Sequence, residues 1–412
     1  MINLELSPGL ENIKGMVGGL AKQMMRPISR KYDKQEHDEP TELAMFGQMM
    51  GGMGGSKGKK GGSSDPMGAM LSGGDDTDST TIKNGGQMMA CVATAQMAWG
   101  CTGLMLAIPG QGLGNAAIAS VATDEQKERF GKVFASMAIT EPGTGSDSAN
   151  ICTTATLDGD EWVINGEKIF VTDGSRCSHI VVWATLDKGI GKAAIKSFVV
   201  PRENQGVEVV RLEKKMGIRA SDTAAITFTD ARIPKDNILG SAEIAKTAEE
   251  RKKAFGGVMQ TFDNTRPMVG SMSLGVARAA LDELAEILEK EGVEPGYVKN
   301  LFNSTAIEAE IYRMEADLEG ARLLIMKAAW MADNKLPNSK NASMAKAKAG
   351  RVGSYVTLRC VELASSIGYS ENQLLEKFAR DSKILDIFEG TQQIQQLIVA
   401  RQVLGKSSKD LK

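Results

Sequence analysis

The chain has 412 residues, of which 42% are hydrophobic and 24% are charged, and its formal net charge is −2. A chain of this length suits two or three domains. The near balance of charge gives no broad attraction to nucleic acid or to an anionic membrane, so neither is expected as a partner.

Histidine and cysteine usage narrows the possible chemistry further. The only two histidines are His37 and His179, so a histidine-based metal site or a Ser-His-Asp triad has almost nothing to be built from. We expect no metal site, and we expect any proton-abstracting base to be a carboxylate. The five cysteines show no CxxC spacing, which is typical of reduced thiols in a cytosolic protein. The start of the chain lacks a signal-peptide pattern, and no stretch reaches the roughly 18 apolar residues of a membrane span, so the expected location is cytoplasmic.

The first region, residues 1–133, is rich in alanine, methionine and glycine and reads as an N-terminal α-helical domain. Within it, residues 49–86 form a low-complexity segment with glycine runs and a lysine-rich patch. Such a segment has too little apolar area to offset its ordering entropy. We predict an exposed, partly disordered loop there.

The second region, residues 134–241, carries short strand-like runs separated by turn signals. Asp158-Gly159-Asp160 is expected to join two strands, and Asn165-Gly166 predicts a two-residue hairpin turn because both positions tolerate positive φ. Short strands with regular turns favour a small antiparallel barrel or sandwich.

The third region, residues 242–412, is helical. Apolar residues recur at spacings of three and four, and residues 305–308 (TAIE) form a capping-box signature. Long helices with short links indicate a bundle. The apolar positions predicted to face its core are Val276, Leu281, Leu284, Leu288, Ile307, Ile311, Met314, Leu318, Ala321 and Ile325.

A glycine-rich stretch at residues 138–147 (AITEPGTGSD) lies where the first region meets the second. Closely spaced glycines beside hydroxyl side chains can line a planar or phosphorylated ligand, although a structural turn is about as good an interpretation of this stretch alone. The stretch resembles the first signature of acyl-CoA dehydrogenases, whose common form is TEPGAGSD. Four further blocks resemble the family in order: 166–174 (GEKIFVTDG, against GxKxWITNG), 215–223 (KMGIRASDT), 262–267 (FDNTRP) and the terminal signature at 380–401.

The resemblance covers roughly residues 90–405 and implies a fold and an activity. The implied fold class is α+β: an N-terminal α-helical domain, a middle antiparallel β-barrel (134–241) and a C-terminal four-helix bundle (242–412). The implied activity is FAD-dependent oxidation of an acyl-CoA to the trans-2-enoyl-CoA, a step of fatty acid β-oxidation. A carboxylate removes the α-proton while the β-hydrogen leaves as hydride to flavin N5, and an electron-transfer flavoprotein is the usual acceptor.

The resemblance also assigns residues. Glu389, within Phe388-Glu389-Gly390-Thr391, matches the catalytic base, with Arg266 beside it; the family's alternative base position holds Thr265, so Glu389 has no rival. Without the family match, a helix-ending Glu389 would be the preferred interpretation. Cofactor-binding residues carried over are Thr140, Gly145, Ser146, Phe170 (in place of the usual Trp), Thr172, Thr391 and Gln393, and substrate-binding ones are Ser146, Asp263, Arg266 and Gly390.

Two stretches depart from the family pattern. The family's RxxFG motif, which reaches the FAD pyrophosphate of a neighbouring subunit, is replaced at 290–297 by KEGVEPGY, with no arginine to pair with a diphosphate. The glycine-rich segment before the terminal signature reads ELASSIG at 362–368.

These departures leave three hypotheses open. The chain is an active dehydrogenase, as a homo-oligomer that holds FAD mainly by its own barrel loops. It is one subunit of a hetero-oligomer with a paralogue. Or it is a non-catalytic partner that has lost flavin. Flavin monooxygenases and nitroalkane oxidases of this fold are a further alternative, but they usually lack the Glu-Gly-Thr.

Overall fold

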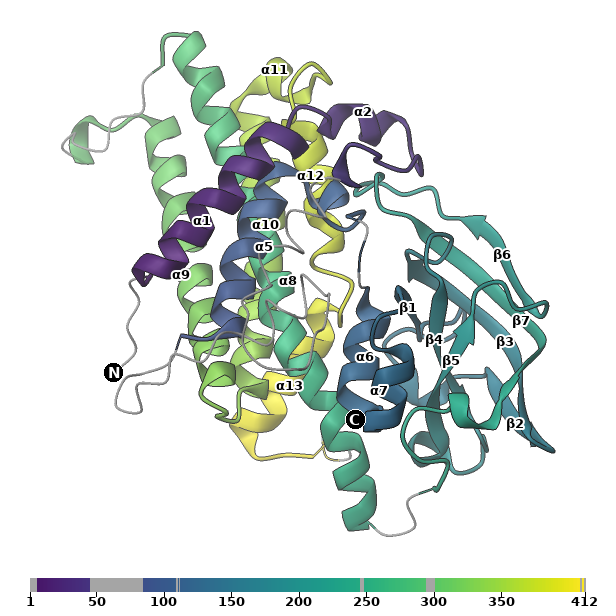
Figure 1. The fold of residues 1–412 in the computed structure, drawn as a ribbon. Coiled ribbons are helices and arrows are strands. Elements are labelled where there is room, and N and C mark those ends of the chain that lie inside the picture. The colour runs from purple at the N-terminus through teal and green to yellow at the C-terminus, as the bar shows by residue number, and fades with distance from the viewer. Residues whose placement is uncertain are drawn as a thin grey trace.

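The computed structural model describes residues 6–44, 84–108, 110, 112–244, 248–293, 301–407 and 410, with the backbone alone at 248–262 and 301. A helical part and a curled sheet lie side by side, and helices α6 and α7 sit against the sheet (Figure 1). The loop predicted at 49–86 lies outside the described residues as far as position 83, and helix α5 begins at Gly86.

The N-terminal helices pack on the C-terminal ones rather than forming a separate core. Apolar residues of α1, α5, α8, α9, α10 and α12 belong to one cluster of buried side chains. The start of α5 is held by a residue from the far end of α9, because the Asp333 carboxylate accepts hydrogen bonds from the N–H groups of Gly85, Gln87 and Met88 at 2.8–3.0 Å. The N-terminal elements are α1 (Pro8–Leu20), the π-helix η1 (Ala21–Met25), α2 (Ser29–Lys34), α5 (Gly86–Met105), α6 (Leu113–Val121) and α7 (Asp124–Phe130).

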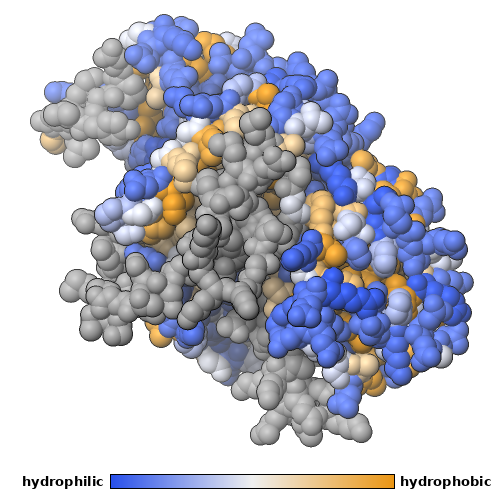
Figure 2. All heavy atoms as spheres, viewed as in Figure 1, coloured by the Kyte–Doolittle hydropathy of each residue, from blue (hydrophilic) through white to orange (hydrophobic). Residues whose placement is uncertain are grey.

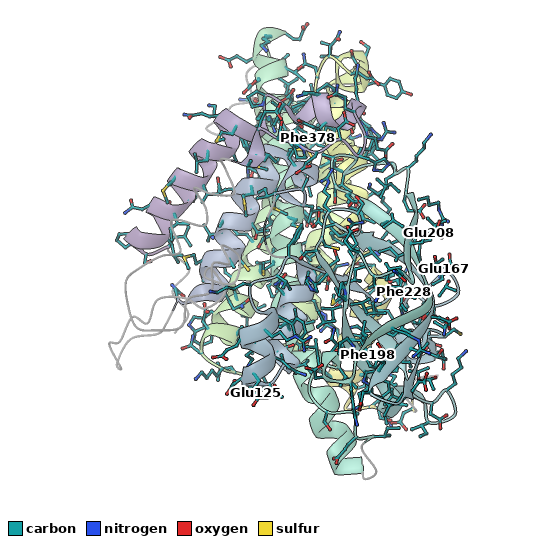
Figure 3. All side chains as sticks on the ribbon, turned by 45° about the vertical axis from the view of Figure 1, so that its right-hand side comes forward. Glu125, Glu167, Phe198, Glu208, Phe228 and Phe378 are labelled. Carbon is teal, nitrogen blue, oxygen red and sulfur yellow. The ribbon has the colours of Figure 1, made fainter. Side chains whose placement is uncertain are left out.

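The middle region is a seven-stranded sheet in the order β1-β4-β2-β3-β7-β6, with β5 paired to β4. Most pairs are antiparallel, but β1 runs parallel to β4, which the expectation of an antiparallel barrel did not include. Side chains alternate between faces: Phe198 and Phe228 are buried inside, whereas Glu167 and Glu208 point outward (Figure 3). The strands are β1 (Ala135–Ala138), β2 (Thr154–Asp158), β3 (Glu161–Thr172), β4 (His179–Thr185), β5 (Ile195–Pro201), β6 (Val207–Leu212) and β7 (Thr223–Pro234).

The hairpin turn predicted at Asn165-Gly166 is wrong, because β3 runs straight through both residues. The register against β7 shifts between Ile164 and Gly166, so the pair forms a bulge. Asn165 locks this bulge: its Nδ2 donates to Asp230 Oδ1 at 3.0 Å, and its Oδ1 accepts from the Asp230 N–H at 2.8 Å. The turn predicted at Asp158-Gly159-Asp160 is confirmed, since β2 and β3 pair as a hairpin around Gly159 at φ 63°.

The C-terminal region consists of long helices, as predicted. Thr305 and Glu308 form the expected capping box at the start of α9. Every predicted core position except Ile307 is buried, and Ile307 is partly buried against the same cluster. The helices are α8 (Ala248–Lys290), α9 (Ala306–Asp333), α10 (Ser339–Leu363), α11 (Ser365–Tyr369), α12 (Leu375–Ile384) and α13 (Gln392–Leu404).

The visible surface of the described residues is largely hydrophilic, with hydrophobic side chains in limited patches (Figure 2). Among the described helices, none is long and apolar enough to cross a membrane.

Candidate active site

The segment between α12 and α13 presents Glu389 from an unusual backbone conformation. Glu389 has φ 54° and Gly390 has φ 91°, so two successive residues lie in the left-handed region. For a residue other than glycine this costs about 1–2 kcal/mol, and it persists only when neighbouring groups hold it. Gln395 Nε2 donates to the carbonyls of Glu389 and Gly390 at 3.2 and 3.1 Å, and Lys346 Nζ donates to the Gly390 carbonyl at 2.7 Å.

The Glu389 side chain is partly buried, and its carboxylate has a single described hydrogen bond, from Thr265 Oγ1 to Oε2 at 3.3 Å. Burial raises the pKa of Glu389, and the Thr265 hydrogen bond and the charges of Arg266 and Lys346 oppose that rise. The result is a carboxylate that accepts a proton more readily than an exposed glutamate does.

Arg266 was expected beside Glu389, and it acts on the carboxylate through its charge. It is only 4% exposed, forms an ion pair with Asp263 and approaches Ser343 Oγ at 3.5 Å. Burial raises the pKa of Asp263 and lowers that of Arg266. Asp263, expected on the CoA side, is therefore already engaged by an arginine.

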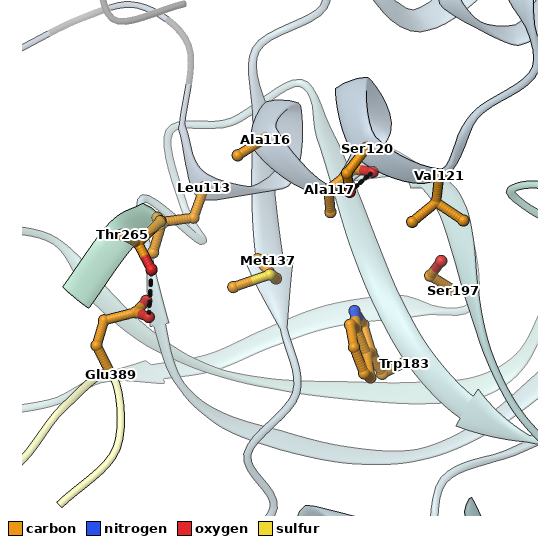
Figure 4. A pocket seen from close by; sticks show the side chains of 10 residues that line it. All are labelled: Leu113, Ala116, Ala117, Ser120, Val121, Met137, Trp183, Ser197, Thr265 and Glu389. Carbon is orange, nitrogen blue, oxygen red and sulfur yellow. Dashed lines mark hydrogen bonds between the residues drawn. The ribbon is translucent and has the colours of Figure 1, made fainter. Parts of the chain in front are cut away.

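A pocket connects this segment with the sheet (Figure 4). Glu389 and Thr265 line one end, and the lining is mostly apolar beyond them. Trp183 brings the indole Nε1 of a partly buried side chain to this lining, where the N–H is shielded from solvent and has no hydrogen-bond partner among the described residues. The full lining is Leu113, Ala116, Ala117, Ser120, Val121, Met137, Trp183, Ser197, Thr265 and Glu389.

The barrel supplies a second group of predicted residues on neighbouring strands. The Thr140 carbonyl accepts from the Ile169 N–H at 2.9 Å, which ties the glycine-rich loop to β3. Phe170 follows on β3, with φ 60° and 60% of its surface exposed, and Thr172 ends the strand. An aromatic ring held out from the sheet in a left-handed conformation offers its surface to a flat ligand.

A buried ion pair fixes the loop that precedes these residues. Lys168 Nζ donates to Glu141 Oε1 at 2.9 Å, and the same carboxylate accepts from the N–H groups of Cys152 and Thr153 at 2.5 and 2.9 Å. Of the predicted loop residues, Gly145 and Ser146 are exposed, and a Cβ added at Gly145 would meet no atom within 4 Å. The glycine-rich loop is therefore held in place at Glu141 and has open space beside Gly145.

The last predicted residues lie at the start of α13. Thr391 caps this helix, with its Oγ1 accepting from the Ile394 N–H at 3.4 Å, and Gln393 is exposed. The structure thus brings Glu389, Gly390, Arg266 and Asp263 together on the bundle side and Thr140, Phe170 and Thr172 together on the barrel side. Of all the predicted site residues, Glu389 alone lines the pocket between the two sides.

The contents of this region fit a planar, partly polar cofactor. The exposed Phe170 ring could stack on such a group, and the indole N–H of Trp183, unpartnered among the described residues, could donate a hydrogen bond to it. The open space at Gly145 would let such a group approach the backbone closely. Most of the divergent stretch at 290–297 lies outside the described residues. Among the described residues no group of three or more potential ligands could hold a metal ion.

Sequence reasoning missed Lys346 and Gln395, the two anchors of the Glu389 turn. Lys346 and Lys348 both lie between alanines, so the charge pattern of the sequence does not distinguish the buried lysine from the other one. The available signal was spacing: Ser343, Lys346, Gly350 and Gly353 recur at three and four, which places Lys346 on a buried face of small residues.

Comparison with known proteins agrees with this architecture. Residues 136–231 match the acyl-CoA dehydrogenase middle domain, and residues 255–404 match the acyl-CoA dehydrogenase C-terminal domain. The chain is 35% identical over 321 residues to the mitochondrial short-chain specific acyl-CoA dehydrogenase of Bos taurus, covering 76% of this chain and 75% of that protein.

Solved structures match over nearly the whole chain. Butyryl-CoA dehydrogenase from Megasphaera elsdenii superposes with a TM-score of 0.81 at 26% identity, covering 98% of this chain and 100% of that one. A chain from the electron transferring flavoprotein study of Acidaminococcus fermentans superposes with a TM-score of 0.79 at 26% identity and the same coverage. The chain therefore belongs to the acyl-CoA dehydrogenase family, whose members are oxidoreductases that act on the CH–CH group of acyl-CoA thioesters.

Proposed function

We propose that the chain oxidises an acyl-CoA thioester to the trans-2-enoyl-CoA, with Glu389 removing the α-proton. The observation that carries this proposal is the position of Glu389: a partly buried carboxylate on an anchored left-handed turn, lining a pocket shared by barrel and bundle.

An α-proton beside a thioester is only weakly acidic, so the base must be stronger than an exposed carboxylate. Burial supplies this by raising the pKa of Glu389. The backbone N–H of Glu389 belongs to the left-handed turn. It can donate to the thioester carbonyl, which would stabilise the negative charge that develops on that oxygen. FAD, when bound, supplies the acceptor for the β-hydride.

The residues proposed to hold the cofactor are those that the barrel and the start of α13 present. Phe170 offers its exposed ring to the flat ring system, and the Thr140 and Thr172 region forms the adjacent floor. Gly145, Ser146, Thr391 and Gln393 are proposed to contact the remainder of FAD, and Ser146, Asp263, Arg266 and Gly390 the acyl-CoA.

We further propose a short acyl chain as the substrate. Beyond Glu389 the pocket is lined by Leu113, Met137 and Trp183, whose apolar surfaces suit a short acyl chain. The bovine relative is specific for short chains, and the Megasphaera neighbour acts on butyryl-CoA.

The proposed electron acceptor is an electron-transfer flavoprotein, supported by the Acidaminococcus neighbour. An oligomer is proposed because α10 and α13 expose large apolar side chains, and exposed apolar patches often mark contacts with another protein chain. Whether the partner is a second copy or a paralogue depends on the divergent stretch at 290–297. The exposed residues are Tyr355, Leu358, Leu397, Val403 and Leu404.

The test is the visible spectrum of the purified chain and its response to acyl-CoA. A yellow protein that bleaches anaerobically with butyryl-CoA supports an active homo-oligomer, and flavin gained only with a co-expressed paralogue supports a hetero-oligomer. A chain that gains flavin under neither condition contradicts the proposal.

Glu389→Gln tests the base directly. The variant should keep bound flavin and lose nearly all of the bleaching rate, because an amide cannot accept the α-proton. Glu167→Gln, on the outer face of the barrel, is the matched control and should behave as wild type. Unchanged bleaching in Glu389→Gln would reject Glu389 as the base.

A further inference from the structure

We propose that Lys346 is a positioning residue for the reaction: its ammonium group holds the Glu389 turn through the Gly390 carbonyl and keeps a positive charge beside the base. This inference rests on the proposed role of Glu389 as the proton acceptor.

Lys346 reaches the turn from a separate helix. It lies on α10, 1% exposed, and its Nζ donates to the Gly390 carbonyl at 2.7 Å. A buried ammonium group is costly unless charge and hydrogen bonds compensate it, so an apolar side chain would be the stable choice for this core position. The presence of a lysine here indicates a requirement for its charge, its hydrogen bond or both.

Charged groups from two elements face this ammonium. Asp386 and Glu389, from the segment after α12, favour its protonated form, and Arg266 from α8 opposes it. Asp386 also contacts the half-exposed Lys383 at 3.5 Å, and Arg266 is balanced by Asp263. Burial is the largest influence and lowers the pKa of Lys346 to about 8. Lys346 in turn favours the ionised form of Glu389.

Gln395 provides the comparison that separates anchoring from charge. It is fully buried and donates to the same turn, at the carbonyls of Glu389 and Gly390, but it carries no charge. A Gln395→Met variant therefore loses an anchor alone. A Lys346→Met variant loses an anchor and a cation, whereas Lys346→Gln keeps a donor and loses the cation.

The experiment measures anaerobic flavin bleaching by butyryl-CoA across pH, together with α-proton exchange into D₂O followed by NMR. Lys346→Met should slow both by about 10- to 100-fold at pH 7, the range expected for losing a hydrogen bond from a charged donor. In a plot of the bleaching rate against pH, the fall of the rate on the acid side (the acid limb) should move to higher pH in this variant, because Glu389 is harder to ionise without the cation. The KM for butyryl-CoA should change little, since Lys346 contacts the turn.

The companion variants give distinct expectations. Gln395→Met should slow both rates without moving the acid limb, and Lys346→Gln should move the limb with a smaller loss of rate. Lys346→Arg should restore the wild-type limb. Lys348→Met is the control on the same helix, because that lysine pairs with Asp317 away from the turn.

A Lys346→Met enzyme with the wild-type rate and acid limb would overturn the proposal. So would a loss of thermal stability and flavin content with an unchanged acid limb in the flavin-loaded fraction, because that pattern reports a structural role alone. If Lys346→Met does not fold, the comparison of Lys346→Gln with Lys346→Arg decides in the same way. The proposed base fails on a different result, an active Glu389→Gln enzyme, so the two ideas are separable.

Discussion

Replacing Asp173 with asparagine should stabilise the protein, and increasingly so as pH rises. Asp173 follows β3 and is 8% exposed, with φ 56°. Its N–H donates to the carbonyl of Asp222, a fully buried residue whose Oδ2 is held by the Ser175 N–H and Oγ at 2.8 and 2.7 Å. Burial and then the neighbouring Asp222 charge raise the pKa of Asp173 to about 7, against a weaker opposing effect of Arg176.

The sign and size of the effect follow from linkage. Below about pH 4, Asp173 is protonated in the folded and unfolded chains alike and contributes no difference. Between pH 4 and 7 the unfolded chain releases the proton while the folded chain retains it, so stability falls as pH rises; above pH 7 the loss is complete. A pKa rise from an ordinary aspartate value to about 7 corresponds to roughly 4 kcal/mol, and we expect about 2–4 after local relaxation on ionisation.

Urea unfolding of wild type and Asp173→Asn at pH 4.5, 6 and 8, with equal flavin content, measures this directly. The stability gain of the variant should be small at the lowest pH and reach its full value at the highest. Asp160→Asn, at an exposed turn, is the control and should show no such trend. A gain that is the same at all three pH values, or a destabilised variant at pH 8, would refute the reasoning. The family motif that this strand resembles has asparagine at this position, so the amide is expected to fit.

Two further substitutions test other parts of the site. Thr265→Val removes the hydrogen bond that favours ionised Glu389, so the acid limb of flavin bleaching should move up by about one pH unit, with bound flavin unchanged; a limb that stays in place would show that the 3.3 Å contact has no electrostatic effect. Lys168→Met leaves Glu141 buried without its cation and should cost about 3–5 kcal/mol in thermal or urea unfolding and weaken flavin retention. Lys214→Met is the exposed control, and equal behaviour of the two variants would contradict the assigned role of the buried pair.

Local sequence rules predicted most of the helices but failed in one strand, for a physical reason. Asn165-Gly166 satisfies the requirements of a two-residue turn, and nothing nearby in the sequence opposes that interpretation. The opposing residue is Asp230, 65 positions away, whose own left-handed conformation and paired hydrogen bonds with Asn165 convert the turn signal into a bulge. Gly166 is required there for a second long-range reason: a Cβ would lie 2.4 Å from Thr153 Oγ1. Register against a distant strand cannot be read from a local pattern.

In the candidate active site, too, a local motif identifies one residue, and residues far away in the sequence determine its surroundings. The terminal motif identified Glu389 because the family places a carboxylate between an aromatic residue and Gly-Thr, but a motif describes neighbours along the chain. Two groups that favour the ionised form of this carboxylate come from elsewhere: Thr265 from α8 and Lys346 from α10. Thr265 donates to the carboxylate and Lys346 to the Gly390 carbonyl, and neither contact can be read from the pattern of the helix that supplies it. A motif can therefore single out a candidate base, whereas the groups that shift the pKa of that carboxylate lie outside the motif.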